Sequence, residues 1–249
     1  MVATQKEIIV FSPHLDDAAL GCSDHILAWK KLGLQVRVVT IFTKLSFPSK
    51  SPTQGSPSDL ELKRWSEDKQ AMNLLGVSWN HLSFADWTFR RNYEKPCYIC
   101  GRPKRCASNV SILGALQKAI TPFAKRGSFV VPLGIGGHID HLLVREAAEN
   151  RTELSELCYY VDYPYALSIL NWTLSDLMEV IAAKKSIKIM SNAKRQLLKK
   201  YTSQIPQIFS HTRLSMPWII WTIAKSYPEI VLYHKRIRLR HERTLALKC

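Results

Sequence analysis

The sequence has no apolar stretch near the roughly 20 residues of a membrane-spanning helix, so no such helix is expected. Met1–Lys6 contains no basic segment leading into an apolar one, so we expect no secretory signal peptide and a cytoplasmic protein. Cysteine is sparse, with 6 in 249 residues, which indicates reduced thiols or metal ligands rather than a disulfide framework. An apolar content of 46% allows a large core.

Acidic residues are scarce in the last part of the chain. From Lys184 onward it carries 15 of the 35 Lys and Arg residues but only two of the 20 Asp and Glu. Such a basic segment attracts phosphates, anionic lipids or acidic substrates, but a solvated lysine-rich surface is an equally good interpretation. We expect no specific nucleic-acid partner and at most weak contact with an anionic membrane surface. A non-enzymatic anion binder that uses this segment stays an alternative, and the oligomeric state is open.

Strand patterns alternate with helical patterns through the first two thirds of the sequence. Strands are expected at Glu7–Phe11, Val36–Phe42, His81–Phe84, Phe129–Pro132 and Leu157–Val161, and helices at Ala18–Leu32, Asp59–Leu75, Val110–Lys125 and His141–Asn150. This alternation predicts a three-layer α/β/α sandwich with a mainly parallel sheet. We expect a single domain over residues 1–249, with an α/β core at about 1–174 and a basic, mainly helical extension at about 175–249.

Polar residues gather where two of these strands end. The first strand is followed by His14, Asp16 and Asp17, and the strand at Phe129–Pro132 by a glycine-rich loop with His138, Asp140 and His141. Open parallel sheets place their active sites at the carboxyl ends of the strands. The two stretches together predict a hydrolytic zinc site.

Zinc in hydrolases keeps three protein ligands and one open position. His14, Asp17 and His141 form a plausible set, since His14 and Asp17 are three residues apart in one loop. Asp16, beside Asp17, fits the second carboxylate that acts as general base.

Two further residues suit supporting roles in such a site. His138 could stabilise a developing oxyanion, and Asp140 could hold a histidine in the correct tautomer. Each short motif alone is weak, because Asp16–Asp17 at a helix start is also ordinary capping. A nucleotide site is disfavoured, because the first strand–helix turn lacks the G-x-G-x-x-G fingerprint.

A second cluster stands apart from these motifs. Cys97, Cys100 and Cys106 follow a C-x2-C-x5-C pattern among basic residues and could ligate a structural zinc or an iron–sulfur centre. No fourth ligand is obvious, so a basic loop that carries thiols is the default interpretation.

The paired motifs Ser12–Asp17 and Gly136–His141 resemble the PIG-L/LmbE-like zinc-dependent N-deacetylases. Further similarity lies at Arg64–Glu67, Tyr159–Tyr165 and Lys200–Gln204. The resemblance implies a Rossmann-like fold, one catalytic zinc ion or another divalent metal, and hydrolysis of the N-acetyl or N-acyl group of a small amino-sugar conjugate.

The resemblance implies the same residue roles as the chemistry: His14, Asp17 and His141 as metal ligands, and Asp16, His138 and Asp140 as catalytic residues. Arg64 could recognise an acidic group of the substrate. The chain departs from the family at Ala18, where Glu is common, and at Ser23–Asp24, where a Gly-Gly pair is common. A metal hydrolase acting on another amide or ester therefore stays a third possibility.

Overall fold

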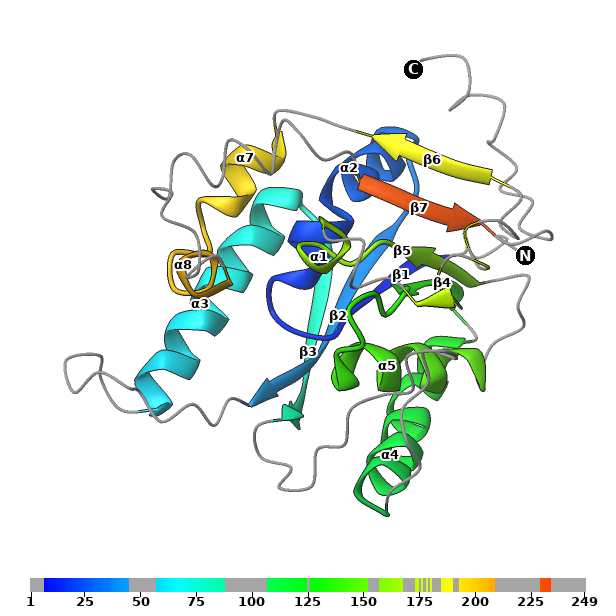
Figure 1. Ribbon diagram of the computed structural model, residues 1–249. Helices are drawn as coiled ribbons and strands as arrows, with labels where there is room; N and C mark the ends of the chain where they lie inside the picture. Colours follow the sequence, from blue (N-terminus) through cyan, green and yellow to red (C-terminus); the bar gives the residue numbers. More distant parts are fainter. Residues whose placement is uncertain are drawn as a thin grey trace, which may run out of the picture.

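A computed structural model describes residues 7–44, 57–87, 107–124, 126–151, 157–167, 173–174, 176, 178, 180, 185–189, 193–208 and 229–233 (Figure 1). The strands are β1 Glu7–Ser12, β2 Val36–Lys44, β3 Ser78–Ala85, β4 Gly127–Pro132, β5 Leu157–Tyr160, β6 Lys185–Ile189 and β7 Glu229–Tyr233. The helices are α1 Asp17–Gly21, α2 Ser23–Lys31, α3 Pro57–Leu75, α4 Ala107–Ala124, α5 Ile139–Glu149, α7 Ala193–Leu198 and α8 Ile205–Ile208, with a 3-10 turn at Tyr165–Leu167. The predicted loop with Cys97, Cys100 and Cys106 lies outside the described residues.

The described strands form one sheet in the order β3-β2-β1-β4-β5-β7-β6. The strands β1 to β5 pair in parallel, whereas β7 runs antiparallel to both β5 and β6. Strand β1 is buried along its whole length, as expected for a central strand covered on both faces. These observations confirm the predicted α/β fold with a mainly parallel sheet.

Helices cover both faces of the sheet, which makes three layers (Figure 1). On one face α1, α2 and α3 pack against β1 and β2 and contact α7; on the other, α4 and α5 pack against β4 and against each other. The chain therefore leaves β1 toward one face and β4, its neighbour, toward the other. Such a reversal opens a crevice at the carboxyl ends of the two strands, where open α/β sheets bind their ligands.

The C-terminal part of the chain contributes more to the sheet than the sequence pattern indicated. Besides α7 and α8 it supplies β6 and β7, two five-residue strands that were not predicted. Among the helices in the described part of the chain, none is both long and apolar enough to span a bilayer.

The helix predicted over Ala18–Leu32 is in fact two helices, because the chain breaks at Cys22. Partners from distant segments replace the missing helical hydrogen bonds at this break. The buried Lys194 Nζ donates to the Leu20 carbonyl oxygen, and the Glu229 carboxylate accepts the backbone N–H groups of Asp24 and His25. Sequence periodicity could not show this break, since its partners lie more than 170 residues away.

Lys194 and Glu229 form a fully buried ion pair at the break. Their side chains are 1% and 0% exposed, and the Lys194 Nζ to Glu229 Oε1 distance is 2.9 Å. Burial disfavours ionisation of Glu229, but Lys194 and His25 together more than offset it and lower the pKa of the carboxyl. The Ser23 hydroxyl also donates to Glu229 (2.7 Å), so Ser23, a departure from the family pattern, has a structural role.

We expect Lys194→Met to destabilise the fold by about 3–5 kcal/mol, because it leaves the Glu229 carboxylate buried without its cation. Urea unfolding would measure this loss. Lys31→Met is the matched control, since Lys31 is exposed on α2 and its replacement should change stability by less than about 0.5 kcal/mol. Equal stabilities for the two variants would contradict the prediction.

Candidate metal and catalytic site

The loop after β1 is held by hydrogen bonds within itself. Ser12 Oγ accepts the Ala18 backbone N–H (3.0 Å) and donates to the His14 carbonyl oxygen (2.6 Å). Asp17 Oδ2 accepts the His14 backbone N–H at 2.8 Å, and the Asp16 side chain makes no capping hydrogen bond to α1. The Ser12 hydroxyl thus accepts a backbone N–H at the start of α1. Helix capping therefore does not explain why Asp16 and Asp17 stand at this position.

The loop after β4 depends on glycine at a close approach. Gly136 has a φ of +85°, and a Cβ there would lie 2.8 Å from the Tyr165 ring. The loop ends at His138, which is the N-cap of α5 and whose Nδ1 accepts the Asp140 backbone N–H at 3.3 Å. The helix begins at Ile139, two residues before the expected start at His141.

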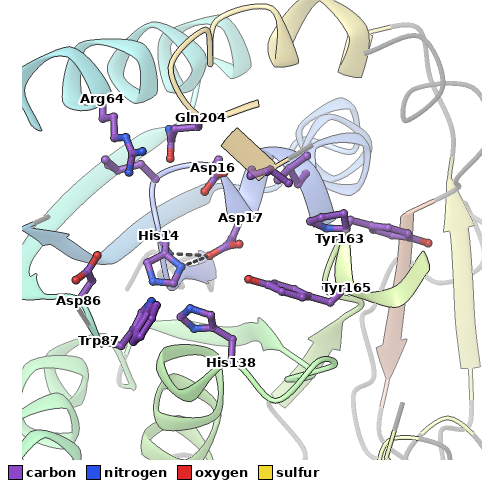
Figure 2. A pocket seen from close by; sticks show the side chains of 14 residues that line it. His14, Asp16, Asp17, Arg64, Asp86, Trp87, His138, Tyr163, Tyr165 and Gln204 are labelled. Atoms are coloured by element: carbon purple, nitrogen blue, oxygen red, sulfur yellow. Dashed lines mark hydrogen bonds and ion pairs between the residues drawn. The ribbon is translucent and has the colours of Figure 1, made fainter. Parts of the chain in front are cut away.

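Three potential ligand atoms face one another at the crevice between the two loops. Asp17 Oδ2 lies 3.2 Å from His14 Nδ1 and 3.2 Å from His141 Nε2. We call these three residues the ligand cradle; Figure 2 shows His14 and Asp17 in it.

In both cradle histidines, the ring nitrogen that points away from Asp17 lies next to a carboxylate. His14 Nε2 is 3.0 Å from Asp140 Oδ2, and His141 Nδ1 is 2.6 Å from Asp162 Oδ1. When each of these nitrogens carries the proton, the inward nitrogen presents a lone pair toward Asp17. His141 Nε2 is buried and has no hydrogen-bond partner. An orphaned acceptor facing a carboxylate oxygen is the arrangement that a bound cation would satisfy.

A second grouping of ligands shares two of these residues. One ring nitrogen from each of His14, His138 and His141 lies within 4.8 Å of the others, a separation that could also hold a metal ion. The described residues therefore offer two ligand sets, which differ in whether Asp17 or His138 is the third ligand.

The electrostatics of the cradle favour positive charge. Burial opposes protonation of His141, but Asp17 and Asp162 outweigh it and raise the pKa of that imidazole to about 9. Asp140 and Asp17 likewise raise the pKa of His14 above its usual value despite burial. A field that stabilises an imidazolium also stabilises a metal cation in the same place.

The two remaining candidates have pKa values shifted in opposite directions. Burial, with His14 and His141 nearby, lowers the pKa of His138 to about 3, so its ring is neutral. Burial, followed by the charge of Asp17, raises the pKa of Asp16 to about 6. A cation bound in the cradle would favour the ionised form of Asp16.

A pocket of about 290 Å³ opens beside the cradle (Figure 2). Of the predicted site residues, His14, Asp16, Asp17, Arg64 and His138 line it. Asp140 and His141 lie behind this lining and are 0% and 1% exposed. The remaining polar and aromatic side chains of the lining are Asp86, Trp87, Tyr163, Tyr165 and Gln204.

Several of these site residues were missed by reasoning from the sequence. Asp162 follows β5 as Asp16 and Asp17 follow β1, so its place after a strand was a usable signal. Its carboxylate also accepts the backbone N–H groups of Gly134 and Ile135, and so holds the glycine-rich loop in place. Asp86 and Trp87, just after β3, gave the same positional signal.

A mainly parallel α/β sheet with histidines and carboxylates at its strand-order reversal defines a Rossmann-like protein with a candidate metal site. The chain belongs to the PIG-L family: the family model described as GlcNAc-PI de-N-acetylase matches residues 9–152. This match confirms the resemblance seen in the sequence motifs.

Individual relatives agree with this assignment. The 2'-N-acetylparomamine deacetylase of Streptomyces fradiae is 27% identical over 163 residues, which cover 64% of this chain and 57% of that protein. The match thus spans little more than half the length of that relative. The zinc-inhibited form of teicoplanin deacetylase Orf2 superposes with a TM-score of 0.68 at 21% identity, covering 91% of this chain and 97% of the other. The A40926 pseudoaglycone deacetylase Dbv21 gives 0.65 at 21% identity, covering 93% and 97%. The two structures share the fold.

Proposed function

We propose that the protein is a zinc-dependent hydrolase that removes the N-acetyl group from an amino-sugar conjugate. The observation that carries the proposal is the ligand cradle, with its orphaned His141 Nε2, placed beside Asp16 at the wall of a pocket. The family description and the relative that acts on acetylated paromamine support an acetylated amino sugar as the substrate.

The ligand set that fits best is His14, Asp17 and His141. His138 Nδ1 accepts a backbone N–H, so the proton of its neutral ring is on Nε2, which then has no lone pair for a metal. Asp17 Oδ2, by contrast, is an acceptor at equal distances from the other two ligands. Zinc held there would polarise the acetyl carbonyl and lower the pKa of water to about 7.

Asp16 carries out the proton transfers, and His138 stabilises the adduct. Asp16 accepts a proton from the attacking water as the new C–O bond forms. His138 Nε2–H donates a hydrogen bond to the oxygen of the tetrahedral adduct. The Asp16 carboxyl then delivers its proton to the nitrogen as the C–N bond breaks, which releases the free amine and acetate.

The pocket lining is compatible with a sugar ring. Trp87 and Tyr165 provide aromatic surfaces, while Arg64 and Asp86 provide a cation and a carboxylate that can hydrogen-bond hydroxyl groups (Figure 2). A volume of about 290 Å³ lies at the lower end of small-molecule sites and suits one such ring.

We expect purified protein to release equal amounts of amine and acetate from N-acetylglucosamine or a simple glycoside of it. Amine labelling and an acetate assay would measure the two products. Removing metal with a chelator should abolish the release, and up to one equivalent of zinc per chain should restore it. Larger amounts are avoided, since one similar deacetylase is known in a zinc-inhibited form. Hydrolysis of simple esters or peptide amides, with no release from any N-acetyl amino sugar, would overturn the proposal.

A further inference from the structure

We propose that Gln204 is a substrate-binding residue that hydrogen-bonds a hydroxyl group of the sugar and so contributes to specificity. This inference rests on the proposed function and goes beyond it, since it assigns one specific polar contact to the sugar ring. Gln204 lines the pocket and is 5% exposed, yet its Nε2 is buried without a hydrogen-bond partner. Buried amide groups are nearly always hydrogen-bonded, so a partner from the substrate is the natural completion.

The position of Gln204 is fixed by its neighbours. The three preceding residues are tied to two consecutive carboxylates of α3. Tyr201 OH donates to Asp68 Oδ1 (2.8 Å), while Thr202 Oγ1 and Ser203 Oγ donate to the two oxygens of Glu67 (2.7 and 2.6 Å). The Ser203 backbone N–H adds a fourth bond, also to Glu67 (3.0 Å).

The side-chain hydrogen bonds of this segment stop at Gln204. The side chains of Tyr201, Thr202 and Ser203 are satisfied by protein partners, and the next side chain, at the pocket wall, is not. The same helix α3 carries Arg64, one turn before Glu67, into the pocket lining. The two carboxylates therefore set Gln204 against the wall that Arg64 also forms, as Figure 2 shows.

The geometry also indicates which part of the substrate Gln204 contacts. In Figure 2 Asp16 lies between Gln204 and the His14–Asp17 pair. The acetyl group must reach the cradle, so Gln204 faces the sugar ring. The two ends of an amide are interchangeable by a flip of the group, and a hydroxyl can both donate and accept, so it would satisfy either orientation.

The test uses Gln204→Met, which keeps the length of the side chain and removes its hydrogen bonds. The substrates are methyl N-acetylglucosaminide and three analogues, each lacking one of its three free hydroxyl groups. We expect the variant to raise KM about tenfold on the parent glycoside with little change in kcat, because the contact is made equally in ground and transition states. On one analogue, and only one, wild type and variant should perform alike, because the partner hydroxyl is already missing.

Ser203→Ala is the matched control, since it removes a docking hydrogen bond and no substrate contact. It should lower the thermal midpoint and affect all four glycosides to the same degree. Calorimetric titration with methyl glucosaminide, the amine product, gives a readout other than activity and should show the same tenfold weakening for Gln204→Met. Metal content should stay at the wild-type level.

Two results would overturn the inference while leaving the proposed function in place. One is an active wild type with no change in KM or product affinity in Gln204→Met; the other is an equal loss on all four glycosides, which a structural role would produce. A wild type that releases no amine from the parent glycoside would instead count against the proposed function itself, and the inference would fall with it.

Discussion

Replacing Asp16 by Asn is expected to lower kcat by about 10²–10⁴-fold, the usual contribution of a general base. The side chain keeps its size but no longer accepts a proton from water. Asp16 is 6% exposed in the pocket lining, beside the cradle residue Asp17. Steady-state kinetics on an N-acetylglucosaminide would measure the loss, and elemental analysis would show metal at the wild-type level, since Asp16 is not one of the proposed ligands.

Asp59→Asn is the control for this substitution. It makes the same chemical change at an exposed position in the first turn of α3, so its kcat should match that of the wild type. Two outcomes would contradict the role of Asp16: near wild-type turnover in Asp16→Asn, or loss of the metal. The second would make Asp16 a ligand and leave the site without an identified base.

The ligand cradle was largely predictable because its members sit in two short motifs, each directly after a buried strand. His14 and Asp17 share one loop, and parallel strands bring the loop with His141 to the same edge. Local spacing and one rule of sheet architecture are enough for that step. Our proposal of Asp17 over His138 as the third ligand needs atomic positions, because it rests on a hydrogen bond from a backbone N–H to His138 Nδ1.

Residues that act through distant partners were not predictable in the same way. Glu229 is one of two acids in the basic region after Lys184, and its significance comes from Lys194 and from a helix break some 200 residues earlier. Gln204 lies in the family-like segment Lys200–Gln204, but only its buried amide without a partner marks the side chain as a candidate site residue. Asp140 was expected to orient a histidine, and its Oδ2 lies 3.0 Å from His14 Nε2. These contacts depend on long-range packing. The spacing of apolar residues, every 2 residues in a strand or every 3.6 in a helix, does not encode such packing.

Asp17→Ala is expected to reduce bound metal from about one equivalent per chain to nearly none, with activity below detection. The substitution removes the oxygen that lies 3.2 Å from both cradle nitrogens, so a three-ligand site becomes a two-histidine site. Elemental analysis after purification without added metal would measure the effect. His141→Ala should behave in the same way, because it removes the buried nitrogen that has no other partner.

His138→Ala separates the two possible ligand sets, since it should retain the metal and lose turnover. Removing one hydrogen-bond donor to an oxyanion lowers kcat by about 10²–10³-fold. A second equivalent of metal, kept by all three variants, would point to Cys97, Cys100 and Cys106. The opposite pattern, with metal retained in Asp17→Ala and lost in His138→Ala, would make His14, His138 and His141 the ligands. His138 could then no longer be the oxyanion donor, because its Nε2 would be bound to the metal.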